Sequence, residues 1–420
     1  MRHRLYTIVI LSASLFWLGC GDMKDFFSLP GEKQCGVSHL NNSISSPLSL
    51  LAAGCGSGSG GTGSTDPRFF VISDRGNHRL LLYPFPLSTG MSATVVWGQT
   101  SFTTSTTGTT QSTLNTPQHG SQNSTTQFFI ADGTNNRILV FSTSSPTTGQ
   151  NAANVLGQTG FTSSSTGLTQ STLNTPHAVE FDASNNRLFV SDNANVRLLV
   201  FNVSSITNGQ NAANVLGQAN FTSNASATTQ AGLIDPGKPA YDASGQRLFL
   251  SDGTARVMVY SVSSISNGQS AANVLGQSLF TTDATATTQS GLSGVTGLCY
   301  GSGYLFVSDG DNNRIMIFDV NAITNGENAA YVLGQTGFTT ATTGTTASTL
   351  SSPRDCAMDA TNNRLFVNDQ GNHRVLVYDV STLSNGKAAY LVLGQTSFTS
   401  GSSGTTASTL NTPHGNGLIN

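Results

Sequence analysis

The feature that most constrains the fold is a repeat of about 59 residues, which begins at Arg68 and continues almost to the end of the chain. Two markers recur in step within it: an aspartate that follows an apolar run, and the glutamine of a Gly-Gln pair. The aspartates are Asp74, Asp132, Asp192, Asp252, Asp309 and Asp369. The glutamines are Gln99, Gln158, Gln218, Gln277, Gln335 and Gln395. Since each marker occurs six times, the chain contains six copies of one structural unit.

Each copy has the pattern of four short strands. In the third copy, apolar or alternating runs occupy residues 177–182, 187–192, 197–203 and 212–218, and mixtures of Asn, Gly and Ser separate them. The composition agrees with β-structure, because the chain has 45 glycines and only 9% charged residues, against roughly 25% in an average soluble protein. Four antiparallel strands repeated six times predict an all-β fold, a six-bladed β-propeller with four strands per blade.

The end of the chain predicts how this ring closes. The stretch STLNTPH occurs at 171–177, where it leads into the first strand of a repeat, and again at 408–414, where only six residues follow. The first repeat starts directly at its second strand, RFFVISD (68–74). We therefore expect residues 414–420 to supply the missing innermost strand of the first blade, which removes two open sheet edges.

The N-terminus is typical of an exported protein. Basic residues precede the apolar run 5–18, which is shorter than the roughly 20 residues of a membrane-spanning helix and ends close to Cys20. This pattern resembles a bacterial lipoprotein signal, with residues 1–19 as signal peptide and a lipid anchor at Cys20; a plain signal peptide is the alternative. Residues 20–67, which end in a Gly/Ser-rich stretch, are expected to be a flexible tether before a propeller at 68–420.

The other four cysteines form two candidate pairs. Cys35 and Cys55 lie in the tether, where they either form a disulfide or stay unpaired. Cys299 and Cys356 fall on the innermost strands of the fifth and sixth blades with opposite parity, so their side chains face each other across the interface between the blades. They either form a bridge there or are two separately buried small residues.

The repeats resemble a known family. Five segments are similar to NHL repeats, which are named for the Asn-His-Leu pattern seen here at Asn77-His78. They lie at 71–83, 130–141, 190–201, 307–318 and 367–378, and the segment at 250–260 is one residue shorter and lacks the Asn, which makes its turn the least secure. The resemblance implies a six-bladed propeller of exported or sensory proteins that often bind ligands or partners.

One charged pair recurs with the repeat: an aspartate and, five residues later, an arginine, as in Asp192 and Arg197. Six copies of one pair cannot all be catalytic. We expect the pair to satisfy backbone groups of a turn and each other; the alternative is a charged rim that contacts a ligand.

The candidate site residues follow the residue, usually proline, that starts each innermost strand, because this position approaches the channel mouth. It holds His414, Gln118 (with His119 next), His177, Gly237, Thr296 and Arg354. Peptidyl-hydroxyglycine lyases, which are six-bladed relatives, use Pro-His at such strand starts to bind zinc, and that resemblance implies a metal site. Here only His177 and His414 match, Thr296 stands where a third alternate-blade histidine would lie, and His119 is displaced by one residue. A metal site, a polar ligand pocket without metal and plain turn residues all stay open.

Other chemistry is not indicated. The glycines at 56–61 lie in the tether with no strand before them, so they form a linker rather than a phosphate loop. The net charge of -3 offers no basic field for nucleic acid. We expect a monomeric binding or scaffold module for a protein or small-molecule ligand, anchored in the inner or outer membrane of a bacterial envelope or exposed on its surface. The alternative is a metal-dependent lyase or hydrolase with its site at the channel mouth.

Overall fold

The computed structural model describes residues 17–18, 37–38, 66–123 and 126–420. The chain divides into two units, residues 1–64 and 65–420. In the first, the described residues form one antiparallel pair, β1 (Trp17–Leu18) with β2 (Val37–Ser38). The anchor candidate Cys20 and the cysteines Cys35 and Cys55 lie outside the described residues. None of the helices in the described part of the chain combines the length and apolar character needed to cross a membrane.

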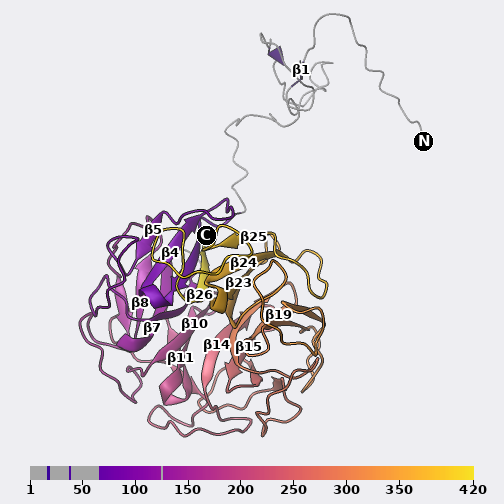
Figure 1. The fold of residues 1–420 in the computed structure, drawn as a ribbon. Helices are drawn as coiled ribbons and strands as arrows, with labels where there is room; N and C mark the ends of the chain where they lie inside the picture. Colours follow the sequence, from indigo (N-terminus) through magenta and orange to yellow (C-terminus); the bar gives the residue numbers. More distant parts are fainter. Residues whose placement is uncertain (1–16, 19–36, 39–65, 124–125) are drawn as a thin grey trace, which may run out of the picture. The chain divides into compact units, whose positions relative to one another are not determined.

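The second unit is a ring of six four-stranded antiparallel sheets, which confirms the predicted propeller (Figure 1). From the innermost strand outward, the first three blades are β26 (Pro413–Ile419), β3 (Phe69–Asp74), β4 (Arg79–Pro84), β5 (Val95–Trp97); β6 (Pro117–Gln122), β7 (Gln127–Asp132), β8 (Arg137–Ser142), β9 (Asn154–Leu156); and β10 (Pro176–Asp182), β11 (Arg187–Asp192), β12 (Arg197–Asn202), β13 (Asn214–Leu216). The other three are β14 (Pro236–Asp242), β15 (Arg247–Asp252), β16 (Arg256–Ser261), β17 (Asn273–Leu275); β18 (Val295–Gly301), β19 (Tyr304–Asp309), β20 (Arg314–Asp319), β21 (Tyr331–Leu333); and β22 (Pro353–Asp359), β23 (Arg364–Asp369), β24 (Arg374–Asp379), β25 (Leu391–Leu393).

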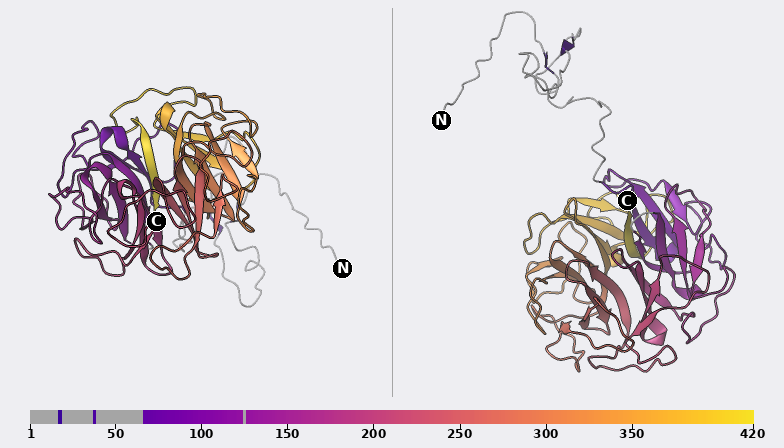
Figure 2. Two further views of the ribbon diagram at one scale, coloured as in Figure 1. Left: turned by 90° about the horizontal axis from the view of Figure 1, so that it is seen from below. Right: turned by 180° about the vertical axis from the view of Figure 1, so that it is seen from behind.

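The C-terminal strand closes the ring, as the repeat pattern predicts. β26 pairs antiparallel with β3, with Asn416 opposite Ile72 and Ile419 opposite Phe69. In the views of Figures 1 and 2 the yellow end of the chain lies beside the indigo first blade. Ile419 is fully buried in the apolar cluster shared by the first and second blades. The last strand therefore completes one blade and packs against the next.

The repeated Asp–Arg pairs are structural. In the third blade, Arg197 Nε lies 2.7 Å from Asp192 Oδ2, and both side chains are 0% exposed. The Arg197 guanidinium also donates to the backbone carbonyls of Thr169 and Thr172, so it fastens the long loop that enters the blade. All six pairs are equally buried, which overturns the alternative of a charged rim that contacts a ligand.

The turn of the fourth blade is better secured than its sequence suggests. Arg256 stands only four residues after Asp252 yet lies 2.5 Å from its carboxylate. No asparagine is present in this turn, but the carboxylate of Asp283 accepts hydrogen bonds from the backbone N–H groups of Thr254 and Ala255 at 3.1 and 2.8 Å. Asp283, which lies in the following loop, thus stabilises the turn in place of the missing asparagine.

The fifth and sixth blades are joined covalently. Cys299 and Cys356 form a disulfide, with 5.6 Å between their Cα atoms, across the interface that strand parity predicted. Both sulfurs lie in the apolar cluster that the two blades share. Of the two alternatives left open by the sequence, the bridge is the one that the structure contains.

Candidate functional site

The innermost strands line the central channel, and each begins with a register irregularity that releases side chains from the sheet. In β10, Pro176 pairs with Asp192 and Ala178 with Ser191, so His177 between them has no partner in the ladder. In β6 the irregularity lies between Pro117 and Gly120. A bulge of this kind re-aims a side chain. Here it lets the residues after the proline leave the plane of the blade.

Three histidines converge at this end of the channel. His414 comes from the first blade, His119 from the second and His177 from the third, and their ring centroids are 4.8 to 5.3 Å apart. One nitrogen from each ring lies within 4.8 Å of the others. The displaced His119 thus fills the gap between the two alternate-blade histidines, and the weak site expected from sequence is a complete triad of imidazoles.

A glycine brings two of these rings together. A Cβ atom at Gly415 would collide with the backbone carbonyl of Gln118 in the neighbouring blade. Because residue 415 has no side chain, β26 and β6 approach closely. His414 precedes this contact and His119 follows Gln118, so the close approach sets their spacing.

The electrostatic surroundings keep the imidazoles neutral. Burial lowers the pKa of His177 and of His414 well below the usual range, and the nearby His119 and the positive charge of Arg75 lower them further. Nδ1 of His177, Nδ1 of His414 and Nε2 of His119 are buried without a hydrogen-bond partner in the described chain. Neutral imidazoles with unused nitrogen atoms are metal ligands.

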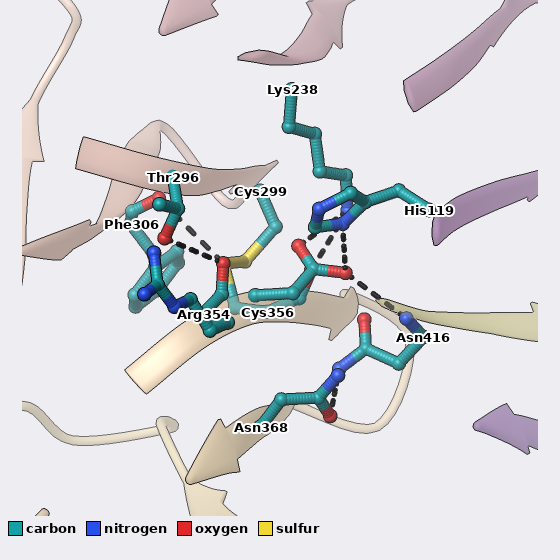
Figure 3. Close-up of a disulfide and its surroundings, with 10 residues drawn as sticks. His119, Lys238, Thr296, Cys299, Phe306, Arg354, Cys356, Asn368 and Asn416 are labelled. Carbon is teal, nitrogen blue, oxygen red and sulfur yellow. Dashed lines mark hydrogen bonds and ion pairs between the residues drawn. A yellow bond between two sulfur atoms is a disulfide. The ribbon is translucent and has the colours of Figure 1, made fainter. Parts of the chain in front are cut away.

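A buried carboxylate contacts one member of the triad, and Figure 3 shows His119, Lys238 and Asn416 around this carboxylate, which is drawn without a label. Asp355 Oδ2 lies 2.9 Å from His119 Nδ1, and Asp355 Oδ1 accepts a hydrogen bond from Lys238 Nζ at 2.8 Å. The backbone N–H of Asn416 donates to the same carboxylate at 3.0 Å. Burial by itself would raise the pKa of Asp355, but Lys238 and His119 together lower it, so the group is anionic. The carboxylate therefore fixes the orientation of the His119 ring through the short contact with Nδ1, although this contact lacks the geometry of a hydrogen bond.

The remaining predicted residues border the triad without joining it. Gln118 is buried, and its Oε1 has no hydrogen-bond partner in the described chain. Arg354 donates from Nε to Gln370 at 3.1 Å. Its charge nevertheless lowers the pKa of His177 and His414, which places it close to the rings. The Thr296 hydroxyl donates to the Arg354 carbonyl at 2.9 Å, and Gly237 offers no side chain.

Sequence reasoning missed three charged residues of the site, Asp355, Lys238 and Arg75. Asp355 and Lys238 come one residue after the channel-mouth position of their strands, as His119 does in β6. Their shared position was the signal that could have found them, because both are charged and stand where β6 carries His119. Arg75 gave no such signal, because it lies in the short turn η2 (Arg75–Asn77) of the first blade.

The triad fits a tetrahedral metal with an open position. Zinc binds imidazole nitrogen at about 2.0–2.1 Å, which places neighbouring ligand atoms roughly 3.3 Å apart. The present nitrogens, within 4.8 Å of one another, must therefore move closer when an ion binds. Three protein ligands leave the fourth position for water or another ligand. With Asp355 behind His119, the site has the ligand and supporting-carboxylate arrangement of such centres.

No protein-family model and no curated protein matches the chain. A solved structure described as "Crystal structure of Nidogen/Laminin Complex" is similar to it at 12% sequence identity and a TM-score of 0.49, covering 84% of this chain and 98% of that one.

Proposed function

We propose that the protein binds one divalent transition-metal ion through His119, His177 and His414, and that a small ligand occupies the open position of that ion. The observation that carries this proposal is the convergence of three imidazole rings, which bring one nitrogen each within 4.8 Å of the others. Each of these rings also has a buried nitrogen without a hydrogen-bond partner in the described chain. The bound ion would act there as a Lewis acid. This makes the propeller a metal-dependent binding module, and the same centre serves a lyase or hydrolase reaction as the alternative.

The charges around the triad indicate the class of ligand. Arg75 has no ion-pair partner among the described residues, and its Nε is buried without a hydrogen bond. Burial lowers the pKa of Arg75, and the nearby positive charge of Arg354 lowers this pKa further. Two guanidinium groups beside a cation site favour an anionic group, such as a carboxylate or phosphate. One oxygen of such a ligand would bind the ion at the open position, and the other oxygens of the ligand would accept hydrogen bonds from an arginine.

Titration of metal-free protein with zinc tests this function. We expect calorimetry to give one ion per chain, and His119→Ala, His177→Ala and His414→Ala each to weaken binding by at least about tenfold to a hundredfold. The matched control is His373→Asn, because His373 lies in a turn outside the triad and Asn136 occupies the equivalent position of the second blade. Zinc affinity that is unchanged in all three triad variants would refute the site.

The proposal also places the propeller outside the cytoplasm, anchored through Cys20. Support comes from the apolar run that ends near Cys20 and from the Cys299–Cys356 disulfide, because such bridges persist in oxidising compartments. The kinship with NHL repeats is part of this proposal and is supported by the five similar segments of the sequence.

Changing Cys20 to alanine tests the anchor. We expect the variant to leave the membrane fraction or to stay unprocessed, because the acceptor thiol for the lipid is gone, and fractionation with intact mass measurement reads out both results. Cys35→Ala is the control and should behave like the natural protein. Normal attachment and maturation of Cys20→Ala would rule out the lipoprotein assignment.

A further inference from the structure

The channel has a second chamber, beyond the triad. A cavity of about 320 Å³ opens between the later residues of the innermost strands, with Glu180, Lys238, Tyr300 and Met358 in its wall. Glu180 follows His177 by three residues, or roughly 10 Å along β10. The histidines do not line this cavity, and Lys238, which reaches Asp355, lies on its boundary. The Lys238–Asp355 ion pair therefore separates the chamber from the triad.

Glu180 brings into this chamber a carboxyl group that has no ion pair among the described residues. Its carboxylate accepts a hydrogen bond from the backbone N–H of Tyr241, and no arginine, lysine or histidine of the described chain lies within ion-pair distance of it. Lys238 is near, but its ammonium group donates to Asp355 Oδ1 at 2.8 Å and to the Cys356 carbonyl at 3.1 Å. Burial raises the pKa of Glu180 to about 7. The carboxyl group thus retains free lone pairs that face the cavity.

The rest of the wall combines polar residues, such as Ser121, Gln122 and Asn416, with an apolar patch. Phe181, Leu298, Met358 and Leu418 line the same space, and Glu180 and Lys238 are the only charged side chains among its described lining residues. With Lys238 neutralised by Asp355, Glu180 gives the chamber one negative charge when its carboxyl group is ionised, which at a pKa of about 7 requires neutral or higher pH. A ligand that satisfies it needs one positive group and a small apolar part, since an aromatic wall also attracts cations.

We propose that this chamber is a second ligand site, which binds a small primary ammonium compound with its nitrogen at Glu180 and its apolar part against Phe181, Met358 and Leu418. The site is independent of the metal triad. The chamber and the triad then select opposite charges: the arginine-flanked triad end takes an anion, and the Glu180 chamber takes a cation.

Three probes of one shape test this site on the full chain: benzylammonium, benzyl alcohol and benzoate, with affinities measured by calorimetry or ligand-observed NMR. We expect benzylammonium to bind at least tenfold more tightly than the other two, because only it compensates Glu180. Equal affinities, a preference for benzyl alcohol or benzoate, or no binding of benzylammonium at tens of millimolar would overturn the proposal. This comparison needs no variant and so does not depend on how a variant folds.

Variants then locate the probe. Glu180→Gln should reduce benzylammonium affinity at least tenfold, whereas Glu327→Gln should not change it. Glu327 is a matched control because it caps the Thr324 N–H, as Gln210 caps the Thr207 N–H in another blade. His177→Ala should leave benzylammonium binding intact, so failure of the metal site and failure of this site are distinguishable. Unchanged affinity in Glu180→Gln would contradict the placement.

Discussion

Deleting residues 412–420 will destabilise the whole propeller, and we expect the free energy of unfolding to fall by more than about 5 kcal/mol. The deletion removes β26, which pairs with β3 along Pro413–Ile419. It also removes Ile419 and Leu418 from the apolar clusters that join the first blade to the second and to the sixth. Two sheet edges open at once, and each neighbouring blade loses part of its interface.

Thermal and urea unfolding of the truncated chain measure this loss. The control is removal of Asn420 alone, because that residue is exposed and follows the last strand. It should unfold like the full chain. A truncated protein that melts within a degree or two of the full-length one would mean that the ring is not held together by this strand.

Replacing Arg197 with methionine should cost about 3–5 kcal/mol at neutral pH, because it leaves the buried Asp192 carboxylate without its partner. It also frees the carbonyls of Thr169 and Thr172 from their hydrogen bonds. Lys387 is the control, because its ammonium group only donates to Thr382 at the surface. Its change to methionine should alter stability by no more than about 1 kcal/mol.

The loss should depend on pH in one direction. Burial raises the pKa of Asp192 above its ordinary value even with Arg197 present, and removal of Arg197 raises it further. A carboxyl whose pKa is higher in the folded state than in the unfolded state destabilises the fold as pH rises above the unfolded value. The penalty of Arg197→Met should therefore shrink as pH falls from 7 toward 4. A penalty that is equal at both pH values would show that the carboxylate is not the cause.

The architecture could be predicted from sequence because it is periodic. The aspartate and the glutamine that stand at Asp192 and Gln218 in the third blade have equivalents in every blade. The second STLNTPH stretch, at the C-terminus, predicts an innermost strand that closes the ring there. Strand parity brought Cys299 and Cys356 to one interface, but parity does not fix the distance between two sulfurs. The alternatives were decided by the 5.6 Å separation of the Cα atoms.

The site was predicted less completely, because it depends on how six strands converge on an axis. His119 stands one residue later in its strand than His177 and His414 do in theirs, and from the sequence this displacement predicts a weaker metal site. In the structure the register irregularity of β6 and the close approach at Gly415 bring its ring to the other two. Asp355 and Glu180 belong to separate blades, and their roles follow from what faces them across the channel rather than from their neighbours in sequence.

X-ray absorption spectroscopy at the zinc edge on the loaded full-length protein tests the metal site most directly. We predict three imidazole nitrogens and one further oxygen or nitrogen ligand at about 2.0–2.1 Å, with outer-shell scattering from all three rings. His119→Ala should remove one imidazole from that count, and His373→Asn should leave the spectrum as it is. A shell of oxygen atoms alone, or a spectrum unchanged in His119→Ala, would contradict a metal ion shared by His119, His177 and His414.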